Sequence, residues 1–429
     1  MRRVLTALAL TAVVTAALNA CSSGASPAGV AAPTGPGPVT IMWWDTSDAE
    51  KEAPAYQSLV ADFEKANPGI RVSYASVPFG EAREEFKAAA GTADAPDVLR
   101  AYVGWTADLA KSGALAPLDG TAAAADSAKF QASLIAQATY DGKLYGIPQV
   151  TDTLALMYNK DLFAKAGVTA APATWDELKA DAALVKEKTG VDGFAFNPQD
   201  YYAMPFLYGE GTDLVDVAGK RITVGSPAAV AGIDTLKSLL AAPGVARLDT
   251  TENAYATVMD AFSNGKAAAV IQGPWETAAL LGSPAFPDSA DLGIAAVPAG
   301  TAGRAGSPLG GHNLVVNSGS DAAHRAAAEK FVGFMTSANS QAFAAARNAT
   351  MPTRDDAYTA EVTAVPGMAG FQALLPAGRP RPALAEYTLL YEPFDTELAK
   401  ILSGQEDTRT GLANAATEAA KLLPGYSTP

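Results

Sequence analysis

The chain has 429 residues, of which 49% are hydrophobic and 18% are charged, so it holds enough apolar material for two or three domains. Its net charge of −14 argues against nucleic acid or anionic lipid as the ligand, because both require a basic surface. Two histidines (His312, His324) and one cysteine (Cys21) exclude an internal disulfide and a Cys/His zinc cluster, and we predict no metal and no cofactor.

The N-terminus has the pattern of a secretory signal. Arg2 and Arg3 precede an uncharged apolar run over residues 4–18, which is shorter than the roughly 20 residues that span a bilayer. The run ends in Leu-Asn-Ala-Cys21, which resembles the lipobox of bacterial lipoproteins. We therefore predict a signal peptide over residues 1–20 and a lipid on Cys21; the alternative is an ordinary cleavage site beside a coincidental cysteine.

A flexible tether is predicted over residues 21–38. From Ser22 to Pro38 the sequence has no charge and no apolar periodicity, so it cannot contribute to a core. The body would then lie outside the cell, held to the membrane by the lipid alone.

Short β-type runs and amphipathic helical runs alternate from residue 39 onward. The first part has strands and helices in turn over residues 39–44, 49–66, 70–74, 81–90 and 97–99. Further helices are predicted over 176–189, 227–240, 255–264, 322–336, 387–402 and 407–423, and further strands over 193–196, 267–271, 293–297 and 313–316. This alternation favours the α/β class with mostly parallel sheets.

Several motifs resemble those of the extracellular sugar-binding proteins of ABC importers, the maltose-binding-protein type, and most closely the maltose- and acarbose-type binding lipoproteins of actinomycetes. They keep the family's order over residues 39–423: Trp43-Trp44-Asp45-Thr46, Phe63–Val72, Ala95-Pro96-Asp97-Val98, Tyr140–Pro148, Leu156–Phe163, Thr174–Leu178, Gln272–Glu276 and Gly310–Leu314.

The resemblance implies a two-lobed periplasmic-binding-protein fold of type II, whose lobes close on the ligand about hinge crossovers. It places the first lobe at residues 39–150 with 307–352 and the second at 151–306 with 353–429, with hinge strands at 148–153 and 307–311. It also implies a monomeric receptor, not an enzyme, that captures a neutral mono- or oligosaccharide, either maltodextrin-like or a small sugar, and delivers it to membrane permease subunits.

A neutral sugar requires flat aromatic platforms and rigid polar groups, especially carboxylates. Residues of these types at predicted strand ends, in the crossovers and in the motifs give the candidate ligand contacts: Trp44, Asp45, Thr46, Trp105, Asp152, Asp200, Tyr201, Trp275, Glu276, Gly311, His312, Asn313, Arg354 and Tyr391.

Other interpretations of some candidates stay open. Asp45 is also suited to cap the helix predicted to start at Ala49, and Glu276 to interact with a helix N-terminus. Trp105 and Trp275 could pack in the core, and Asp152 could face solvent.

His312 marks a departure from the family pattern, since related actinomycete sequences carry tryptophan between the Gly-Gly pair and the asparagine. Our hypothesis is that His312 faces the cleft and shifts preference from a long maltodextrin toward a small sugar such as galactose. The alternative is a histidine packed in the hinge.

Two other functions remain open at this point. A lipoprotein glycoside hydrolase would use two carboxylates, and acids are plentiful in the chain. The same fold could also bind a polyamine, an amino acid or a metal complex in place of a sugar.

Overall fold

The computed structural model describes residues 38–92, 95–303 and 306–429. The predicted signal peptide over residues 1–20, the predicted lipid site at Cys21 and the tether up to residue 37 lie outside these described residues. Among the described helices, none has the length and apolar character needed to cross a bilayer.

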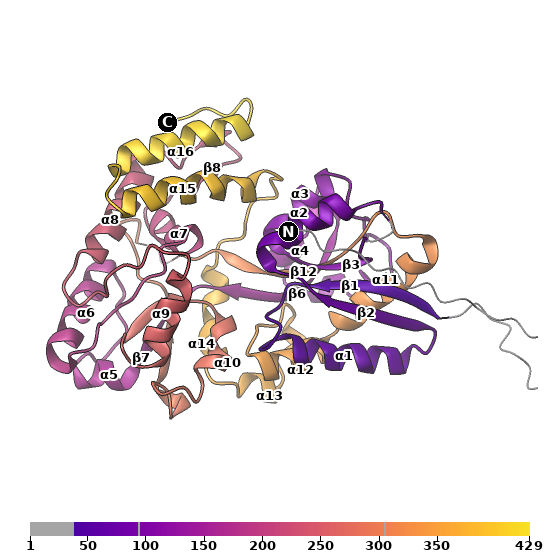
Figure 1. The fold of residues 1–429 in the computed structure, drawn as a ribbon, viewed down its shortest axis with the longest axis horizontal. Helices are drawn as coiled ribbons and strands as arrows, with labels where there is room; N and C mark the ends of the chain where they lie inside the picture. The colour runs from indigo at the N-terminus through magenta and orange to yellow at the C-terminus, as the bar shows by residue number, and fades with distance from the viewer. Residues whose placement is uncertain (1–37, 93–94, 304–305) are drawn as a thin grey trace, which may run out of the picture. The chain divides into compact units, whose positions relative to one another are not determined.

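The first sheet has five strands in the order β2-β1-β3-β12-β6 (Figure 1). Its strands are β1 (Val39–Asp45), β2 (Ile70–Ser76), β3 (Val98–Tyr102), β6 (Gly146–Thr153) and β12 (Leu309–Val316). β1 pairs in parallel with β2 and β3, whereas β12 runs antiparallel to both β3 and β6. The sheet is therefore mixed, and the expectation of mostly parallel pairing is wrong for its second half.

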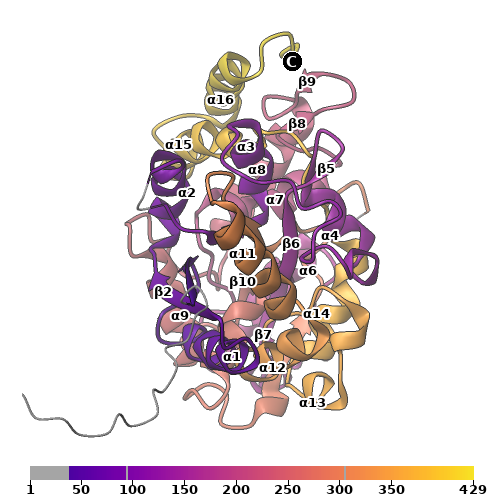
Figure 2. The same cartoon turned by 90° about the vertical axis from the view of Figure 1, so that its right-hand side faces the viewer.

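Helices α1 (Ala53–Ala66) and α11 (Ala322–Met335) cover one face of this sheet (Figure 2). The buried indole of Trp43 in β1 contacts Tyr56 of α1 and Phe331 of α11 edge-on. Helices α2 (Phe79–Ala89) and α3 (Thr106–Lys111) cover the other face, where Leu99 packs with Phe86 and Leu109.

The second main sheet has three antiparallel strands in the order β10-β7-β11. They are β7 (Ala155–Asn159), β10 (Ala269–Gln272) and β11 (Leu292–Ala295). The strand predicted over 193–196 is not formed as one: Phe194 and Ala195 make single bridges to Val245 and Val270.

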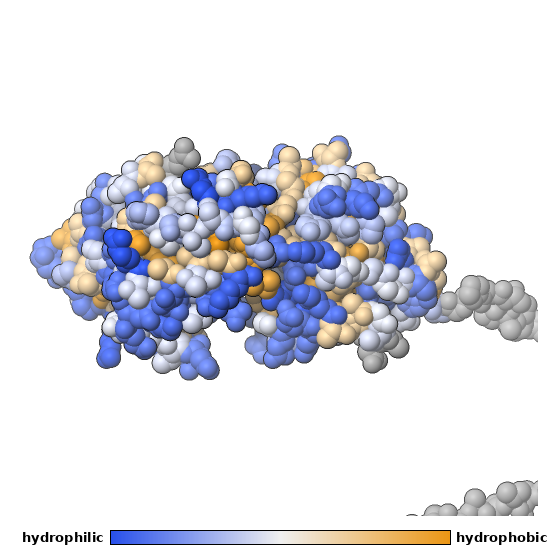
Figure 3. Space-filling view, turned by 90° about the horizontal axis from the view of Figure 1, so that it is seen from above, coloured by the Kyte–Doolittle hydropathy of each residue, from blue (hydrophilic) through white to orange (hydrophobic). Residues whose placement is uncertain are grey.

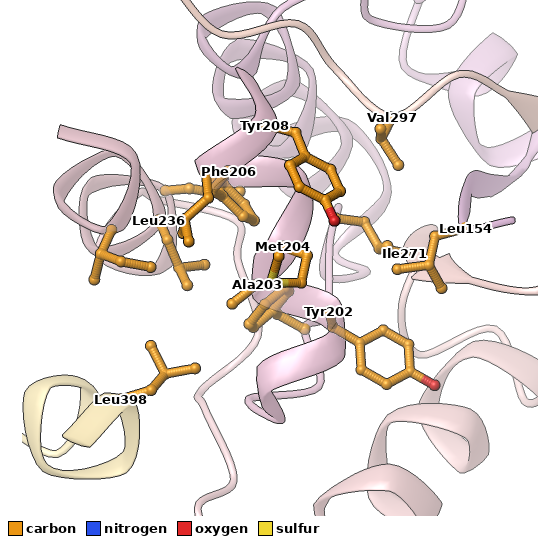
Figure 4. Packing of buried hydrophobic residues seen from close by; sticks show 14 of the residues in the cluster. Leu154, Tyr202, Ala203, Met204, Phe206, Tyr208, Leu236, Ile271, Val297 and Leu398 are labelled. Atoms are coloured by element: carbon orange, nitrogen blue, oxygen red, sulfur yellow. The ribbon is translucent and has the colours of Figure 1, made fainter. Parts of the chain in front are cut away.

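Helix α7 (Asp200–Gly209) is the centre of the core beside this sheet. Figure 4 shows its side chains surrounded by Leu236 of α8 (Pro227–Leu240), Leu398 of α15 (Tyr391–Leu402) and Ile271 of β10. Because α7 is buried along nearly its whole length, its first turn is held rigidly, and that turn carries Asp200 and Tyr201.

The longer helices agree with the predicted ranges to within a few residues. The predicted helix over 387–402 is a 3-10 turn, η7 (Tyr387–Leu390), followed by α15. The other helices of at least six residues are α4 (Ala132–Gln137), α5 (Lys160–Lys165), α6 (Trp175–Thr189), α9 (Ala254–Ser263), α12 (Ala338–Asn348), α14 (Met368–Leu374) and α16 (Thr408–Leu422). The shorter helical turns are η1 (Val103–Trp105), η2 (Ser127–Lys129), η3 (Pro274–Glu276), α10 (Thr277–Leu280), η4 (Ser289–Asp291), η5 (Asp355–Ala357), α13 (Ala360–Thr363) and η6 (Leu375–Ala377). Two small hairpins pair β4 (Thr139–Tyr140) with β5 (Lys143–Leu144) and β8 (Val215–Asp216) with β9 (Arg221–Ile222).

The chain passes between the two main sheets where β6 leads into β7 through Leu154. There β6 pairs with the start of β12, with Gly310 opposite Asp152 and Gly311 opposite Thr151. The backbone N–H of Leu154 donates to Ser307 Oγ at 2.7 Å. The two segments predicted as hinges are therefore hydrogen-bonded partners of one another.

Candidate functional site

A cleft of about 710 Å³ lies beside this crossover. It is lined by the ends of β1, β3 and α2, by β6 and β12, by the start of α7, by η3 and by the segment from Arg381 to Tyr391. Nine of the predicted contact residues line it: Thr46, Trp105, Asp152, Asp200, Tyr201, Trp275, Glu276, His312 and Tyr391.

The structure places the other five predicted residues outside the cleft lining: Trp44, Asp45, Gly311, Asn313 and Arg354. Trp44 packs against the apolar cluster under α2 and α3. Arg354 lies away from the cleft, where it pairs with Asp356 at 2.6 Å and with Asp126 at 3.4 Å.

Asp45 is fully buried behind the lip of the sheet. Its carboxylate accepts hydrogen bonds from Ser47 Oγ at 2.5 Å and from Tyr74 Oη at 3.1 Å. Asp45 does not cap the following helix, because α1 begins at Ala53 with Glu52 at its N-cap. Asp45 supports Arg100, whose Nε lies 3.8 Å from Asp45 Oδ1 and whose side chain lines the cleft.

The Gly310-Gly311 pair has a backbone role. Gly311 has φ of +116°, and a Cβ there would lie 2.1 Å from the carbonyl oxygen of Val150 on the paired strand. A Cβ on Gly310 would lie 2.1 Å from Asp152 Oδ1 and 2.8 Å from Tyr201 Oη. The two glycines therefore let β12 approach β6 and leave room for the acid and tyrosine of the cleft.

One wall of the cleft is a cluster of four rings that we call the aromatic wall: Phe79, Tyr102, Trp105 and His312. The Phe79 and Trp105 ring centroids are 4.8 Å apart, and His312 lies edge-on to Tyr102 at 5.9 Å and to Phe79 at 6.0 Å. Phe79 is 46% exposed at the rim. Figure 3 shows hydrophilic and hydrophobic side chains mixed over the face that it presents. Among the described residues, Phe79 is the large hydrophobic side chain that stays exposed.

Sequence reasoning missed Phe79 and Tyr102. Tyr102 was detectable, because β3 continues to it and the same strand-end argument that selected Thr46 applies there. Phe79 had no comparable signal, since it begins a helix after Pro78.

His312 lines the cleft with a neutral ring. Burial, and then the positive charge of Arg100, lower the pKa of His312 well below its usual range. Its Nε2 atom has no hydrogen-bond partner among the described residues. A neutral imidazole in this position can donate to or accept from a ligand hydroxyl.

The opposite wall is fixed by hydrogen bonds, and we call Tyr202, Tyr255, Trp275 and Glu276 the hydrogen-bonded wall. Trp275 Nε1 donates to Tyr255 Oη at 2.9 Å, and Tyr255 Oη donates to Glu276 Oε1 at 2.6 Å. Tyr202 Oη donates to Gln272 Oε1 at 3.0 Å. A Cβ on Gly273 would lie 1.9 Å from the indole of Trp275, so glycine is required for the turn that presents this ring.

Two acids lie where the crossover and α7 meet. Burial raises the pKa of Asp152 to about 6, although the charge of Arg381 and a hydrogen bond from Tyr201 lower it. Tyr201 Oη donates to Asp152 Oδ1 at 3.2 Å. Burial, and then the negative charge of Asp395, raise the pKa of Asp200 to about 7.

Arg381 and Tyr391 complete the lining from the C-terminal part. The guanidinium of Arg381 lies over the ring of Tyr102 at 4.5 Å and over Tyr201 and Tyr391 at 5.5 Å. Sequence reasoning missed Arg381, which lies outside the helices and strands in an Arg-Pro-Arg-Pro run. Among the residues that the structure describes, no cluster of His, Cys, Asp and Glu is arranged to hold a metal ion.

Comparison with known proteins places this geometry in a family. Residues 46–342 match the family model of bacterial extracellular solute-binding proteins. The chain is 27% identical to the diacetylchitobiose binding protein DasA of Streptomyces coelicolor over 81% of each chain. It is 28% identical to the maltooligosaccharide ABC transporter solute-binding lipoprotein of Streptococcus pneumoniae strain R6 over 75% of each chain.

Solved structures show the same fold. The GacH receptor of Streptomyces glaucescens, known unliganded and with acarbose, is 39% identical, with a TM-score of 0.85 over 91% of this chain and 100% of that one. Maltose-bound MalE3 of T. maritima is 26% identical, with a TM-score of 0.80 over 90% of this chain and 100% of that one. The predicted α/β two-lobed class is confirmed by these likenesses.

Proposed function

Because this chain belongs to the family of bacterial extracellular solute-binding proteins, we propose that it captures an extracellular neutral carbohydrate in the cleft and delivers it to the permease of an ABC importer. The relatives named above include a maltooligosaccharide-binding lipoprotein and a receptor that binds acarbose. We propose a maltose-like oligosaccharide, or a smaller sugar, as the ligand.

The observation that carries this proposal is the pairing of aromatic rings with fixed polar groups on facing walls. Trp275 offers a partly exposed indole held by Tyr255, and Phe79 and Trp105 offer rings from the other side. Apolar C–H faces of a sugar stack on such rings, while hydroxyl groups bond to carboxylates such as Asp152. A metal chelate would instead require clustered metal ligands.

The first test is a thermal-shift screen with mono- and oligosaccharides. A ligand that binds only the folded state raises the melting temperature, by an amount that grows with ligand concentration. We expect a shift with at least one glucose- or galactose-containing sugar. If polyamines or amino acids shift the melting temperature and sugars do not, the carbohydrate proposal fails.

Catalysis is the competing function, because Asp152 and Asp200 are both carboxyl groups with raised pKa values in the cleft. A glycoside hydrolase uses such a pair as acid and nucleophile or base. The family membership supports a binding role without turnover. After incubation with maltotetraose, chromatography should detect only the intact sugar. Hydrolysis products would contradict the receptor proposal.

His312 bears on ligand length. Imidazole covers less area than an indole would and adds a hydrogen-bonding nitrogen, so we propose that it favours a small sugar. Calorimetry with glucose, galactose, maltose and maltotetraose tests this. Affinity that rises steadily with chain length would contradict it.

We also propose that the two lobes comprise residues 39–150 with 307–352 and 151–306 with 353–429, and close about the paired segments 148–153 and 307–311. The antiparallel pairing of these segments, which link the two main sheets, supports this division. Small-angle scattering should show a smaller radius of gyration when a sugar that binds is added.

The anchoring proposal concerns Cys21. We propose that the chain is secreted, cleaved before Cys21 and held at the outer face of the cell membrane by a lipid on that thiol, as a monomer. Two observations support this: the lipobox-like sequence before Cys21, and the pneumococcal relative, which is a lipoprotein. Mass spectrometry of the membrane fraction should show an acylated N-terminal cysteine, and Cys21→Ser should release the protein into the medium.

A further inference from the structure

Arg381 is a buried cation without a hydrogen-bonded partner among the described residues. Its side chain is 7% exposed, and Nε, Nη1 and Nη2 are all buried with no acceptor from that part of the chain. The guanidinium stays protonated at any physiological pH. Three aromatic rings surround it, but rings satisfy none of its N–H donors. Such an arrangement is unfavourable unless something else supplies acceptors.

The surrounding chain is built to hold this guanidinium in place. A Cβ on Gly104 would lie 2.8 Å from Arg381 Nη1 and 2.7 Å from Thr388 Oγ1, so only glycine admits the side chain at this distance. Thr388 Oγ1 donates to the Gly104 carbonyl at 2.6 Å, and the backbone N–H of Arg381 donates to Gln137 Oε1 at 3.1 Å. The unfilled donors are therefore a fixed feature of the cleft lining.

The acids near Arg381 limit which kind of ligand group can accept hydrogen bonds from its guanidinium. Asp152 lines the same cleft, close enough for the charge of Arg381 to lower its pKa. Of the two carboxylate oxygens of Asp152, only Oδ1 accepts a hydrogen bond from a described residue, and its donor is Tyr201. The guanidinium of Arg381 lies over the ring of that tyrosine. An anionic ligand group would be repelled by Asp152 and Asp200. A neutral hydroxyl group can accept from the arginine and donate to the carboxylate at the same time.

We propose that Arg381 is a ligand-binding, specificity-determining residue: one hydroxyl oxygen of a neutral sugar accepts from its guanidinium while the hydroxyl proton is donated to Asp152. This rests on the proposed function, since it assumes that the cleft takes a carbohydrate. It identifies the polar end of the site with the Arg381–Asp152 pair and excludes sugar acids as preferred ligands.

The test compares Arg381→Met with Arg379→Met. Arg379 is the matched control, since it lies two residues away, stacks on Tyr208 at 4.9 Å and is outside the cleft lining. Calorimetry with the best sugar from the thermal-shift screen should give about 10- to 100-fold weaker binding for Arg381→Met, as expected for loss of hydrogen bonds to a charged group, and unchanged binding for Arg379→Met.

Melting temperature separates ligand binding from a structural role. Replacing a buried charge that lacks protein acceptors with an apolar side chain of similar length is neutral or stabilising. The ligand-free melting temperature of Arg381→Met should therefore equal or exceed that of the wild type. A variant that unfolds, or that keeps full affinity, overturns the proposal.

A series of monodeoxy sugars gives a second measurement on the wild type and on Asp152→Asn. One deoxy analogue should bind the wild type about 10-fold or more weakly than the parent sugar does. Its loss should be smaller in Asp152→Asn, because there the removed hydroxyl no longer has its carboxylate partner and only the contact with Arg381 remains. If the losses of affinity from the deoxy change and from Asp152→Asn simply add for every analogue, no single hydroxyl is shared between Arg381 and Asp152, and the proposal is refuted. A glucuronic acid derivative that binds more tightly than the neutral sugar would refute it as well. If the wild type binds no sugar at all, the proposed function fails instead.

Discussion

The two walls of the cleft both present aromatic rings, but they are held by different forces. In the aromatic wall, Phe79, Tyr102, Trp105 and His312 contact one another edge-on or tilted. In the hydrogen-bonded wall, Trp275 is tied through Tyr255 to Glu276. Packing alone leaves a ring free to adjust, whereas the hydrogen bond from Trp275 to Tyr255, which is itself bonded to Glu276, fixes the angle of the indole. We infer that the second wall sets the position of the sugar and that the first adapts to its length.

The largest effect is expected at Gly310, which lies next to the acid and the tyrosine between the two walls, Asp152 and Tyr201. A Cβ there meets Asp152 Oδ1 at 2.1 Å, so Gly310→Ala should displace both side chains and weaken sugar binding by about 100-fold. Calorimetry measures the effect. Gly80→Ala is the control, since nothing lies within 4 Å of a Cβ at that helical position. Equal affinities for the two variants would show that the acid and tyrosine do not contact the sugar.

The hydrogen-bonded wall should be the more sensitive of the two. Trp275→Ala removes the platform and should weaken binding about 30-fold, a loss typical of an aromatic anchor. Tyr255→Phe keeps the ring but removes the hydrogen bonds to Trp275 and Glu276, and we expect a loss of about 10-fold. Calorimetry on both variants measures these losses of sugar affinity. If Tyr255→Phe binds like the wild type, the hydrogen bonds do not position the indole.

Binding should weaken with acid because of Asp152, which lies between the walls. With a pKa of about 6 in the free protein, the carboxyl group is mostly ionised at pH 7 and mostly protonated at pH 5. A ligand that requires the carboxylate must displace that proton, so affinity should fall about 10-fold from pH 7 to pH 5.

The control for the pH profile is Asp152→Asn, which should bind weakly with little dependence on pH over this interval. Asp200 has a pKa of about 7 and titrates nearby, so Asp200→Asn identifies its share. A wild-type affinity that stays constant or rises toward pH 5 would be incompatible with a required carboxylate at Asp152.

The smallest effect is expected at the rim of the aromatic wall. Phe79 is 46% exposed, so Phe79→Ala should leave the melting temperature unchanged and weaken binding of maltotetraose about 3-fold. Maltose should be affected less, because a short ligand does not reach the rim. If both sugars lose the same affinity, Phe79 contacts the part of the sugar that maltose and maltotetraose share. That result would contradict the inference that the aromatic wall adapts to ligand length.

Strand alternation explains which site residues the sequence could predict. Along β1 the buried side chains are Ile41, Trp43 and Asp45, so period two places Asp45 on the same buried face as Trp43. The same alternation along β12 brings His312 into the cleft and directs Asn313 to Thr106. The strand ends could be predicted from the sequence. Which side chains at those ends face the cleft could be decided only from the register of the paired strands.

Arg381 was beyond sequence reasoning for a different reason. No helix or strand pattern contains it, and its position depends on Gly104 and Gln137, which are distant in the chain. The fold class, most helices and the crossover segments followed from local pattern and family motifs. A contact between an irregular segment and a remote glycine follows from neither.

The most direct test of the central claim is a calorimetric titration of the purified protein with maltose, repeated with Trp275→Ala. Saturable binding at one site per chain, weakened about 30-fold in the variant, is the predicted result. Absence of binding to maltose and to the wider sugar panel, or equal binding by the variant, would contradict a carbohydrate receptor that uses this cleft.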